Sequence, residues 1–340
     1  MKGAFCISLD FELHWGGFEK WPLDLKGDNA VKNSYNKYFL STREVIPRVL
    51  NLFSQYEMHV TWAAVGMLLH STREELLSNA PTVRPTYKAT ELSAYNYIEQ
   101  VGIGPDEASD PFHFGNSLVK EILNTPNQEL GTHTFSHYYC NEAGQTVAQF
   151  KEDLMAAQRA AATHGRTLRS LVFPRNQFND SYLKACYELG IRVVRSNPVD
   201  WFWHIESTQA ESGWKRLHRG MDAYFPIGGK NTYRLEGIQT REGYPICLPA
   251  SRLLRPYQRR EFVLNDMKIS RILGEMKSAA NNSEVYHLWW HPHNFANYPE
   301  QSLSGLKKIL DGFHKLRAAS QMESLNMGEL YDRRNPGNNP

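Results

Sequence analysis

The sequence predicts an α/β protein in which about six or seven parallel strands form a sheet or barrel. Short, continuous apolar runs, typical of strands buried on both faces, alternate along the chain with segments of helical periodicity. Polar and charged side chains follow several of these runs, as expected where the carboxyl ends of parallel strands meet at one edge. The chain has 340 residues, 41% of them hydrophobic and 12% aromatic, which is enough for a large core.

The first part of the chain predicts a strand, a helix and a second strand. Residues 3–9 form a short apolar run, and residues 18–40 show no regular pattern. Ser41 and Thr42 then precede an acidic residue and apolar positions at helical spacing, which indicates a helix capped at these two residues. Residues 58–65 are typical of the second strand, so this unit favours parallel pairing.

A long insertion follows before the alternation resumes. Residues 71–115 contain several prolines and little periodicity, so we expect them to cover one face, with short helices at 72–78 and 90–99. Residues 116–124 have a helical pattern, and residues 128–131 are expected to form the third strand.

The second half of the chain continues the same alternation. Composition and capping residues, such as Asp180, predict helices over residues 146–163, 180–189, 263–280 and 302–319. Apolar runs predict strands over residues 168–173, 191–194 and 284–290. Residues 203–262 are basic, aromatic-rich and irregular, and we expect a second insertion there. Residues 1–330 are predicted to form one domain, and residues 331–340 a flexible tail.

Charge and hydropathy exclude several classes of partner. The 38 Lys and Arg residues nearly balance 36 Asp and Glu residues, which leaves a net charge of +2. We therefore expect no nucleic-acid partner and have no argument for a membrane-surface partner. No apolar run approaches the roughly 20 residues of a membrane-spanning helix.

The cysteines indicate a reducing compartment. Cys6, Cys140, Cys186 and Cys247 include no C-x-x-C pair, and each has apolar or aromatic neighbours, as expected for buried free thiols. The first apolar run stops at Asp10, too soon for a signal peptide. We therefore expect a cytoplasmic protein.

Two histidines four residues apart are the first indication of a functional site. His133 and His137 lie in the stretch LGTHTFSHYY, and their spacing can aim two imidazoles at one metal ion. An isolated pair of this kind is more often structural, so a third ligand is needed. The candidate is Asp10-Phe11-Glu12, because two carboxylates that point the same way on a strand would be relieved by a cation.

Other polar residues also come directly after predicted strands. Arg175, Asp200 and His291 each occupy such a position. Taken singly, each residue could be a cap, a surface ion-pair partner or a packed loop residue. Their common position at the carboxyl ends of strands favours one shared site.

The ordered motifs resemble the polysaccharide deacetylases of carbohydrate esterase family four, also called the NodB-homology family. The motifs are SLDFE, THTFSH, FPRNQ, PVDW and HLWWHPH, and they span residues 8–293. The second motif is the most specific, because the family pattern H-S/T-x-x-H is matched at both histidines and at the threonine. The resemblance implies a distorted (β/α) barrel, and with the two insertions described above we expect about seven parallel strands.

The resemblance also implies roles for the first two motifs. The family holds a divalent metal, often zinc, with an Asp and two His, so His133 and His137 would be metal ligands. Asp10 is assigned as the catalytic base and Glu12 as the third metal ligand, although the two carboxylates could exchange these roles. The sequence departs from the family here, since two adjacent Asp residues are replaced by an Asp-x-Glu arrangement.

The remaining motifs imply the rest of the catalytic apparatus. Arg175 corresponds to the arginine that orients the base, but Pro174 precedes it and the family's tyrosine is missing. Asp200 would belong to the supporting charge network. His291 would be the general acid, with His293 as a second candidate.

Three hypotheses about function follow from these motifs. The first is a metal-dependent hydrolase, with Zn²⁺ as the expected metal, that removes N-acetyl or O-acetyl groups from a carbohydrate in surface polysaccharide biosynthesis. The second is a hydrolase of cyclic amides or ureides on the same barrel. The third is a non-catalytic carbohydrate-binding homologue whose motifs have diverged.

Overall fold

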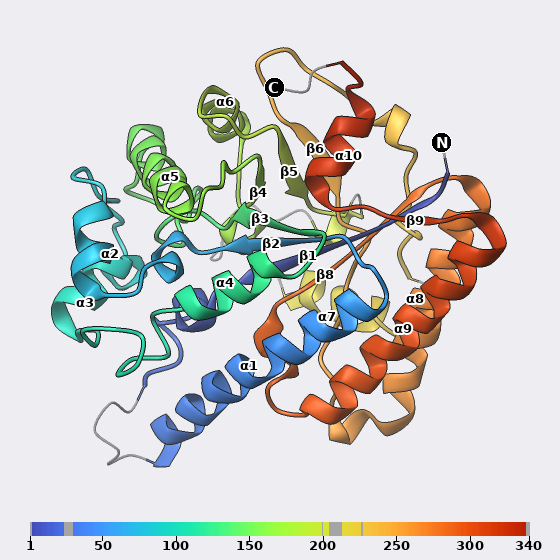
Figure 1. Cartoon of the computed structure of the whole chain (residues 1–340), viewed down its shortest axis with the longest axis horizontal. Helices are drawn as coiled ribbons and strands as arrows, with labels where there is room; N and C mark the ends of the chain where they lie inside the picture. Colours follow the sequence, from blue (N-terminus) through green and yellow to red (C-terminus); the bar gives the residue numbers. More distant parts are fainter. Residues whose placement is uncertain (1, 24–29, 199, 204–212, 226, 338–340) are drawn as a thin grey trace.

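A single curled sheet of parallel strands forms the centre of the molecule (Figure 1). The computed structural model describes residues 2–23, 30–198, 200–203, 213–225 and 227–337. The strands are β1 (Ala4–Phe11), β2 (Val60–Ala64), β3 (Gln128–Thr132), β4 (Ser170–Val172), β5 (Val193–Ser196), β6 (Ile246–Pro249), β7 (Arg252–Leu253), β8 (Val285–Trp290) and β9 (Glu323–Ser324). Their order is β6-β5-β4-β3-β2-β1-β8-β7, with β9 paired to β1, and the pairing is parallel throughout. The predicted parallel α/β architecture is confirmed.

The strands β6 and β7 are neighbours in the chain but lie at opposite ends of this order. Between them, the Ala250 amide donates to the Ser196 carbonyl at 2.9 Å, and the Ser251 amide donates to the His287 carbonyl at 2.7 Å. One extended segment therefore pairs first with β5 and then with β8. This segment brings the two edges together and curls the sheet into a distorted barrel, in which β6 and β7 share one strand position.

The expectation that residues 203–262 form an irregular insertion is wrong for part of that range, which contains α7, β6 and β7. Pro245 and Pro249 flank the short apolar run of β6, so the sequence shows a broken pattern there. The strand exists because β5 offers it a hydrogen-bonding edge, which a local pattern does not reveal.

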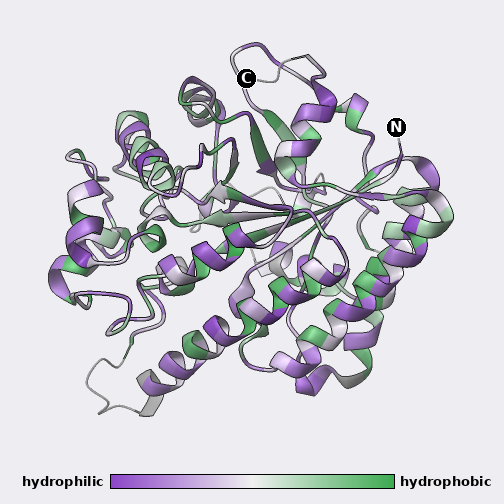
Figure 2. Ribbon diagram, in the orientation of Figure 1, coloured by the Kyte–Doolittle hydropathy of each residue, from purple (hydrophilic) through white to green (hydrophobic). Residues whose placement is uncertain are grey.

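Helices surround the sheet and turn their apolar faces toward it (Figure 2). They are α1 (Ala30–Gln55), α2 (Arg73–Asn79), α3 (Ala94–Gln100), α4 (Asn116–Asn124), α5 (Val147–Ala162), α6 (Asp180–Glu188), α7 (Gly213–Asp222), α8 (Phe262–Asn282), α9 (Pro299–Ser320) and α10 (Met327–Arg334). The long helices α8 and α9 pack against each other (Figure 1). The short helices predicted in the first insertion are confirmed as α2 and α3.

The start of α1 differs from the prediction. Ser41 and Thr42 were expected to cap a helix, but they lie inside α1, which begins at residue 30. The Thr42 hydroxyl donates to the Tyr38 carbonyl one turn earlier, and the Ser41 hydroxyl donates to the Ala296 carbonyl outside the helix. Hydroxyl side chains can satisfy themselves in this way within a helix, so a Ser-Thr pair does not by itself mark a cap.

The caps of α5 and α6 show how closely local chemistry can locate a helix start. Thr146 caps α5 in a capping box with Gln149, and this agrees with the helix predicted from residue 146. The N-cap of α6 is Asn179 rather than Asp180, and its side chain accepts a hydrogen bond from the Ser181 amide. The predicted cap of α6 is therefore wrong by one residue.

The expected flexible tail is partly helical. Asn326 and Glu329 form a capping box that starts α10, and Leu330 is fully buried. Arg169 pairs with Asp332 through both guanidinium nitrogens at 3.0 Å, which fixes the helix beside the sheet. Residues 331–334 thus belong to an ordered helix, while residues 338–340 lie outside the described residues.

The loop that follows β3 is held by a buried carboxylate of α5. Asp153 accepts hydrogen bonds from the amides of Phe135 and Ser136, at 2.7 and 3.1 Å, and from the Ser136 hydroxyl. Thr134 and His137 in this loop have φ angles of 64° and 57°, a region that non-glycine residues seldom occupy. Asp153 therefore helps to hold a strained loop in one conformation.

We predict that Asp153→Ala destabilises the protein by at least about 2 kcal/mol, because it leaves two buried amides without an acceptor. Urea unfolding monitored by circular dichroism measures this loss. Glu152→Ala is the control, since Glu152 is half-buried on the same helix and forms no ion pair among the described residues. The Glu152→Ala substitution should change the free energy of unfolding by no more than about 0.5 kcal/mol. An equal effect of the two substitutions would contradict the assigned role of Asp153.

Candidate active site

Polar side chains that follow β1, β3 and β8 meet at the carboxyl ends of the barrel strands. Asp10 lies near the end of β1, and Glu12 follows that strand at the start of a short 3₁₀ helix. His133 follows β3, and His137 lies in the strained loop beyond it. His291 follows β8, which pairs with β1. The structure thus brings together five of the residues that the sequence singled out.

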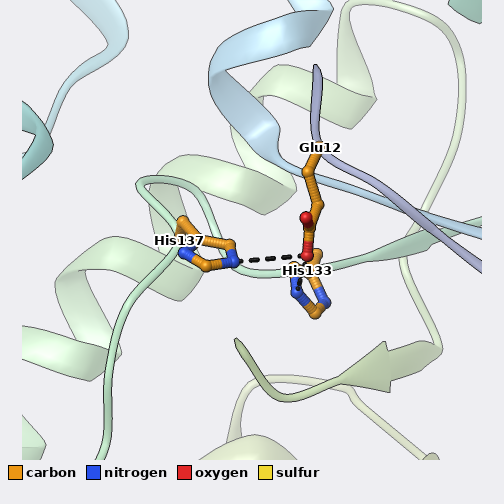
Figure 3. Close-up of side chains that lie close together, drawn as sticks. All are labelled: Glu12, His133 and His137. Atoms are coloured by element: carbon orange, nitrogen blue, oxygen red, sulfur yellow. Dashed lines mark hydrogen bonds and ion pairs between the residues drawn. The ribbon is translucent and has the colours of Figure 1, made fainter. Parts of the chain in front are cut away.

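Glu12 is the centre of this group. Its Oε1 atom lies 2.9 Å from His133 Nε2 and 3.3 Å from His137 Nε2 (Figure 3). The same oxygen lies 3.5 Å from His291 Nε2. Glu12 is 4% exposed, so this carboxylate is buried among three imidazoles.

Glu12, His133 and His137 have the donor set and spacing of a metal site. Their ligand atoms all lie within 4.8 Å of one another, and all three residues are buried. The contact between His133 and Glu12 lacks hydrogen-bond geometry, so both ring nitrogens of His133 are buried without a hydrogen-bond partner. Two imidazoles and one carboxylate are a known ligand set of catalytic zinc, which leaves a further coordination position open. The residues therefore fit a divalent metal ion.

Tyr139 supports one of these candidate ligands. Its hydroxyl lies 3.0 Å from His137 Nδ1, the ring nitrogen that faces away from Glu12. A hydrogen bond at that nitrogen fixes the ring orientation, as is usual behind a metal-bound histidine. The guanidinium of Arg175 lies 4.1 Å over the Tyr139 ring.

Asp10 forms an ion pair with Arg195, on β5, rather than with Arg175. The two guanidinium nitrogens of Arg195 donate to the two carboxylate oxygens of Asp10, at 2.6 and 2.8 Å. Arg195 and Asp10 are 1% and 2% exposed. The expected contact of Arg175 with Asp10 is therefore wrong, and Arg195 is the residue that orients this carboxylate.

Arg195 is itself fixed by several neighbours. It donates to the Ser8 hydroxyl at 3.1 Å and to the Asn176 side-chain oxygen at 3.2 Å. The Trp289 ring stacks on its guanidinium at 4.2 Å. Ser8 also lies 2.9 Å from Nε2 of His287, and burial together with the nearby Arg195 lowers the pKa of that histidine to about 3. A neutral His287 can accept a hydrogen bond from the Ser8 hydroxyl. Arg195 is then the positively charged member of this network.

The sequence contained a signal for Arg195 that the motif comparison passed over. Arginine is almost never fully buried unless it is paired, and Arg195 directly follows Val193 and Val194 in the predicted strand of residues 191–194. The run continues as strand β5 through Ser196, so the guanidinium enters the interior. A charged residue inside a short apolar run is therefore a candidate partner for a buried carboxylate.

Arg175 lies instead beside two other carboxylates. It pairs with Glu19, and its Nη1 atom lies 3.7 Å from Glu142. Its backbone φ of 53° is in the left-handed region, as is that of Asn176. These contacts place Arg175 behind Tyr139 at the edge of the site.

Among the described residues, Asp200 contacts neither Asp10 nor Arg195. Its carboxylate accepts hydrogen bonds from the Gly229 amide at 3.2 Å and from the Asn231 side chain at 2.6 Å. The described contacts therefore do not bring Asp200 into the network where the resemblance placed it. Asp200 fastens the segment that follows α7 to the end of β5.

His291 and His293 occupy different positions. His291 Nε2 lies 3.6 Å from Asp10 Oδ2, in addition to its contact with Glu12. The His293 ring stacks on His291 with a centroid distance of 4.8 Å, and it is buried against Trp21. His291 therefore contacts both carboxylates. His293 packs against the His291 ring, and its ligand nitrogen lies within 4.8 Å of those of Glu12 and His291, so these three residues form a second possible ligand group.

Burial and neighbouring charges shift the pKa values of the two carboxylates and of His291 and His293 in different directions. Burial opposes ionisation of Asp10, but Arg195 and His291 outweigh it and lower the pKa of Asp10. Burial likewise opposes ionisation of Glu12, yet the surrounding histidines hold its pKa well below the ordinary value. Burial disfavours the charged form of His291, but the two carboxylates raise its pKa. Burial and the neighbouring His291 lower the pKa of His293 to about 3. These shifts favour ionised carboxylates beside a protonated His291.

The barrel and this group of side chains define an α/β-barrel protein with a candidate metal centre at the carboxyl ends of its strands. Residues 35–194, somewhat less than half of the chain, match the sequence model of the family described as Polysaccharide deacetylase. The resemblance to the polysaccharide deacetylases that the motifs predict is therefore confirmed over this segment. It includes His133 and His137, whereas Asp10, Glu12 and His291 lie outside the matched range. No curated protein sequence matches the chain.

Solved structures share the fold at low sequence identity. A protein from Mycobacterium smegmatis assigned to the polysaccharide deacetylases aligns with a TM-score of 0.59 and 12% identity, over 98% of this chain and 90% of its own. A similarly assigned protein from Pseudomonas aeruginosa PAO1 aligns with a TM-score of 0.55 and 10% identity, over 98% and 92%. A GH57-type branching enzyme from Pyrococcus horikoshii aligns with a TM-score of 0.52 and 11% identity, over 98% and 70%. At these identities the likeness establishes the fold alone.

The helices offer no candidate for crossing a bilayer. Within the described ranges, none combines the length and the apolar character that a membrane span requires.

We predict that Arg195→Met destabilises the protein by about 3–5 kcal/mol at neutral pH, because it leaves the buried Asp10 carboxylate unpaired. Asp10→Asn in the same chain should recover part of this loss. Arg195 lowers the folded-state pKa of Asp10, so the stabilisation exists above the unfolded value of about 3.9 and disappears as the pH falls through the folded value. Urea unfolding of the single and double variants at neutral and acid pH measures the coupling.

Arg175→Met supplies the matched control for this cycle. Because Arg175 pairs with Glu19, its effect and that of Asp10→Asn should add within about 0.5 kcal/mol. A strong coupling of Asp10 to Arg175, with none to Arg195, would restore the expectation drawn from the sequence.

Proposed function

We propose that this protein is a metal-dependent deacetylase that removes N-acetyl, or O-acetyl, groups from a carbohydrate. The observation that carries the proposal is the convergence of Glu12, His133, His137, Asp10 and His291 at one end of the barrel. Two imidazoles and a carboxylate suit a metal, a second carboxylate suits a base, and a further imidazole suits an acid. The family of residues 35–194 supports this choice of chemistry.

The candidate metal ligands are Glu12, His133 and His137. Zn²⁺ suits this donor set best, and when bound it would polarise the acetyl carbonyl and lower the pKa of water to about 7. Tyr139 would hold His137 in the ligating orientation through its hydrogen bond to Nδ1.

Asp10 is suited to accept the proton of the attacking water. Its carboxylate stays ionised because Arg195 lowers its pKa, and the bidentate contact fixes its orientation. An amide nitrogen leaves poorly unless it is protonated, and His291 is positioned to donate that proton. The water oxygen joins the acetyl carbon as the C–N bond breaks, which releases acetate and a sugar amine.

The biological setting belongs to the same proposal. We infer a cytoplasmic role in surface polysaccharide biosynthesis, where the acetyl group would be removed from an activated sugar or a growing glycan. The isolated, apolar-flanked cysteines support this setting.

Acetate release tests the proposal directly. The purified protein, loaded with Zn²⁺, should release acetate from N-acetylated or O-acetylated oligosaccharides, and a chelator should abolish the release. Metal analysis should find roughly one zinc ion per chain, and His137→Ala should lose it. A zinc-loaded protein that releases no acetate from any acetylated sugar would count against deacetylation.

The two neighbouring histidines provide a sharper prediction. His291→Ala should lower kcat by about 10²–10⁴-fold without removing the metal, because it deletes the proton donor. His293→Ala should have a smaller effect, since His291 lies within 3.6 Å of both Asp10 and Glu12, whereas His293 forms no ion pair with either carboxylate among the described residues. Acetate release with metal content measured in parallel decides between them. The reverse order of effects would make His293 the acid.

A further inference from the structure

A cavity lies between α8 and α9, the two long helices that pack against each other (Figure 1). Its volume is about 350 Å³, at the lower end of the roughly 300–1,000 Å³ of small-molecule pockets. Its lining comes from the segment after β7, from the N-terminal halves of α8 and α9 and from the 3₁₀ helix η8 (Pro292–Phe295). Among the described residues, those of the candidate active site do not line it.

The inner wall of the cavity is apolar and is tied to the barrel. Phe295 is 1% exposed and stacks on Trp290 with a centroid distance of 5.8 Å. The amide of Leu254 donates to the Trp289 carbonyl at 2.8 Å. Further apolar lining comes from Tyr257, Ile269 and Leu306. The cavity can therefore hold an apolar body, and η8 separates it from the candidate metal centre.

One cation in this cavity has no carboxylate of its own. Arg255 forms no ion pair among the described residues, and its Nη2 atom donates to the Arg219 carbonyl at 2.8 Å. Burial lowers the pKa of Arg255, and Tyr224 and Glu261 oppose this shift only in part. Glu261 pairs with Lys268 instead, at 3.0 Å. Because arginine stays protonated in proteins, an anion beside Arg255 would compensate a charge that the fold leaves unpaired.

The two carboxylates that line the cavity are already engaged. Glu300 accepts hydrogen bonds from both guanidinium nitrogens of Arg48, at 2.7 and 2.8 Å. Asp266 pairs with Lys308 at 3.0 Å. These acids therefore do not supply the missing partner of the arginine.

The start of α9 adds hydrogen-bond donors to the cavity. The helix begins at Pro299 without a side-chain cap, so the amides of its first turn have no partner within the helix. Ser302 lines the cavity and is 6% exposed, and its hydroxyl has no hydrogen-bond partner among the described residues. Buried hydroxyls without a partner are rare, and an acceptor atom in the cavity would supply one.

We propose that this cavity is a second ligand site, which binds a small amphipathic acid whose carboxylate or phosphate pairs with Arg255 and whose apolar body lies against Phe295. Ser302 donates to the same ligand. The proposal is independent of the proposed deacetylation, since it uses neither the candidate metal centre nor its neighbours. The occupant would contact η8, which also carries His293, so the position suits an effector of the active site.

A neutral apolar molecule and solvent are the alternative occupants. A neutral molecule would match the apolar wall but would leave the Arg255 guanidinium without an anion. Solvent would match the polar groups but would leave the apolar wall wet. An acid accounts for the wall, the unpaired cation and the unpartnered hydroxyl together.

Titration of the full-length protein with phenylpropionate, phenyl phosphate and the neutral phenylpropionamide tests the site. These probes are similar in size, and calorimetry or ligand-observed NMR gives their dissociation constants. At least one anion should bind roughly tenfold or more tightly than the amide, because only an anion forms an ion pair with Arg255. The tighter anion assigns the acidic group as a carboxylate or a phosphate. Failure of both anions to bind, or equal binding of the amide, overturns the proposal.

Substitutions assign the contacts. Arg255→Gln should weaken anion binding roughly tenfold or more, and Ser302→Ala about two- to tenfold. Ser302→Ala costs the fold no hydrogen bond of this hydroxyl, so it tests the site even where Arg255→Gln perturbs folding. Arg260→Gln is the matched control, because Arg260 is exposed on the same segment and does not line the cavity. Unchanged binding in both Arg255→Gln and Ser302→Ala contradicts the site.

Two further measurements locate the bound anion. Hydrogen exchange should slow in η8 and in the first turn of α9 when the anion is added, since Phe295 and Ser302 line the cavity. His137→Ala should leave binding unchanged, because a carboxylate could otherwise be held at the candidate metal centre. Loss of binding in His137→Ala, or unchanged exchange in η8 and α9, overturns the proposal. Neither readout uses acetate release, so the result is separate from the test of deacetylation.

Discussion

The site depends on two carboxylates that are buried two residues apart at the end of β1. Asp10 is 2% exposed and Glu12 is 4% exposed, so each loses almost all of its hydration. Burying a charge is costly unless a partner compensates it. Arg195 compensates Asp10 from β5, and the histidines after β3 and β8 compensate Glu12. The fold must therefore bring the ends of four strands together, and the site exists because it does so.

The curl of the sheet explains how β5 can serve β1, from which it is separated by three strands in the sheet order. A flat sheet would hold Arg195 far from Asp10, since adjacent strands lie about 4.8 Å apart. The segment that contains β6 and β7 prevents this, because it pairs with β5 at one end and with β8 at the other. The barrel interior then lets the guanidinium reach across to Asp10.

The parts of the fold that follow from local pattern were predictable. The run of residues 3–9 is a strand because it is apolar apart from Ser8, and all eight residues of β1 are buried. The helix after Thr146 follows from its capping box. The strands β6 and β7 depend instead on edges supplied by distant segments. The helix α1 continues through Ser41 and Thr42 because their hydroxyls find carbonyl acceptors at Ala296 and Tyr38, so this pair does not mark the helix start.

The same distinction applies to the site. Glu12, His133 and His137 were identified because their residue types and spacing carry the chemistry of metal ligation. The choice between Arg175 and Arg195 could not be made by motif, because each arginine lies near the end of a strand and only the curl of the barrel decides which one faces Asp10. Arg175, which the resemblance assigned to orienting Asp10, lies behind Tyr139, and Arg195, one strand further along the sheet, holds the Asp10 carboxylate instead. A branching enzyme shares this fold, so the barrel alone does not determine the chemistry. The support for deacetylation comes from the donor set around Glu12.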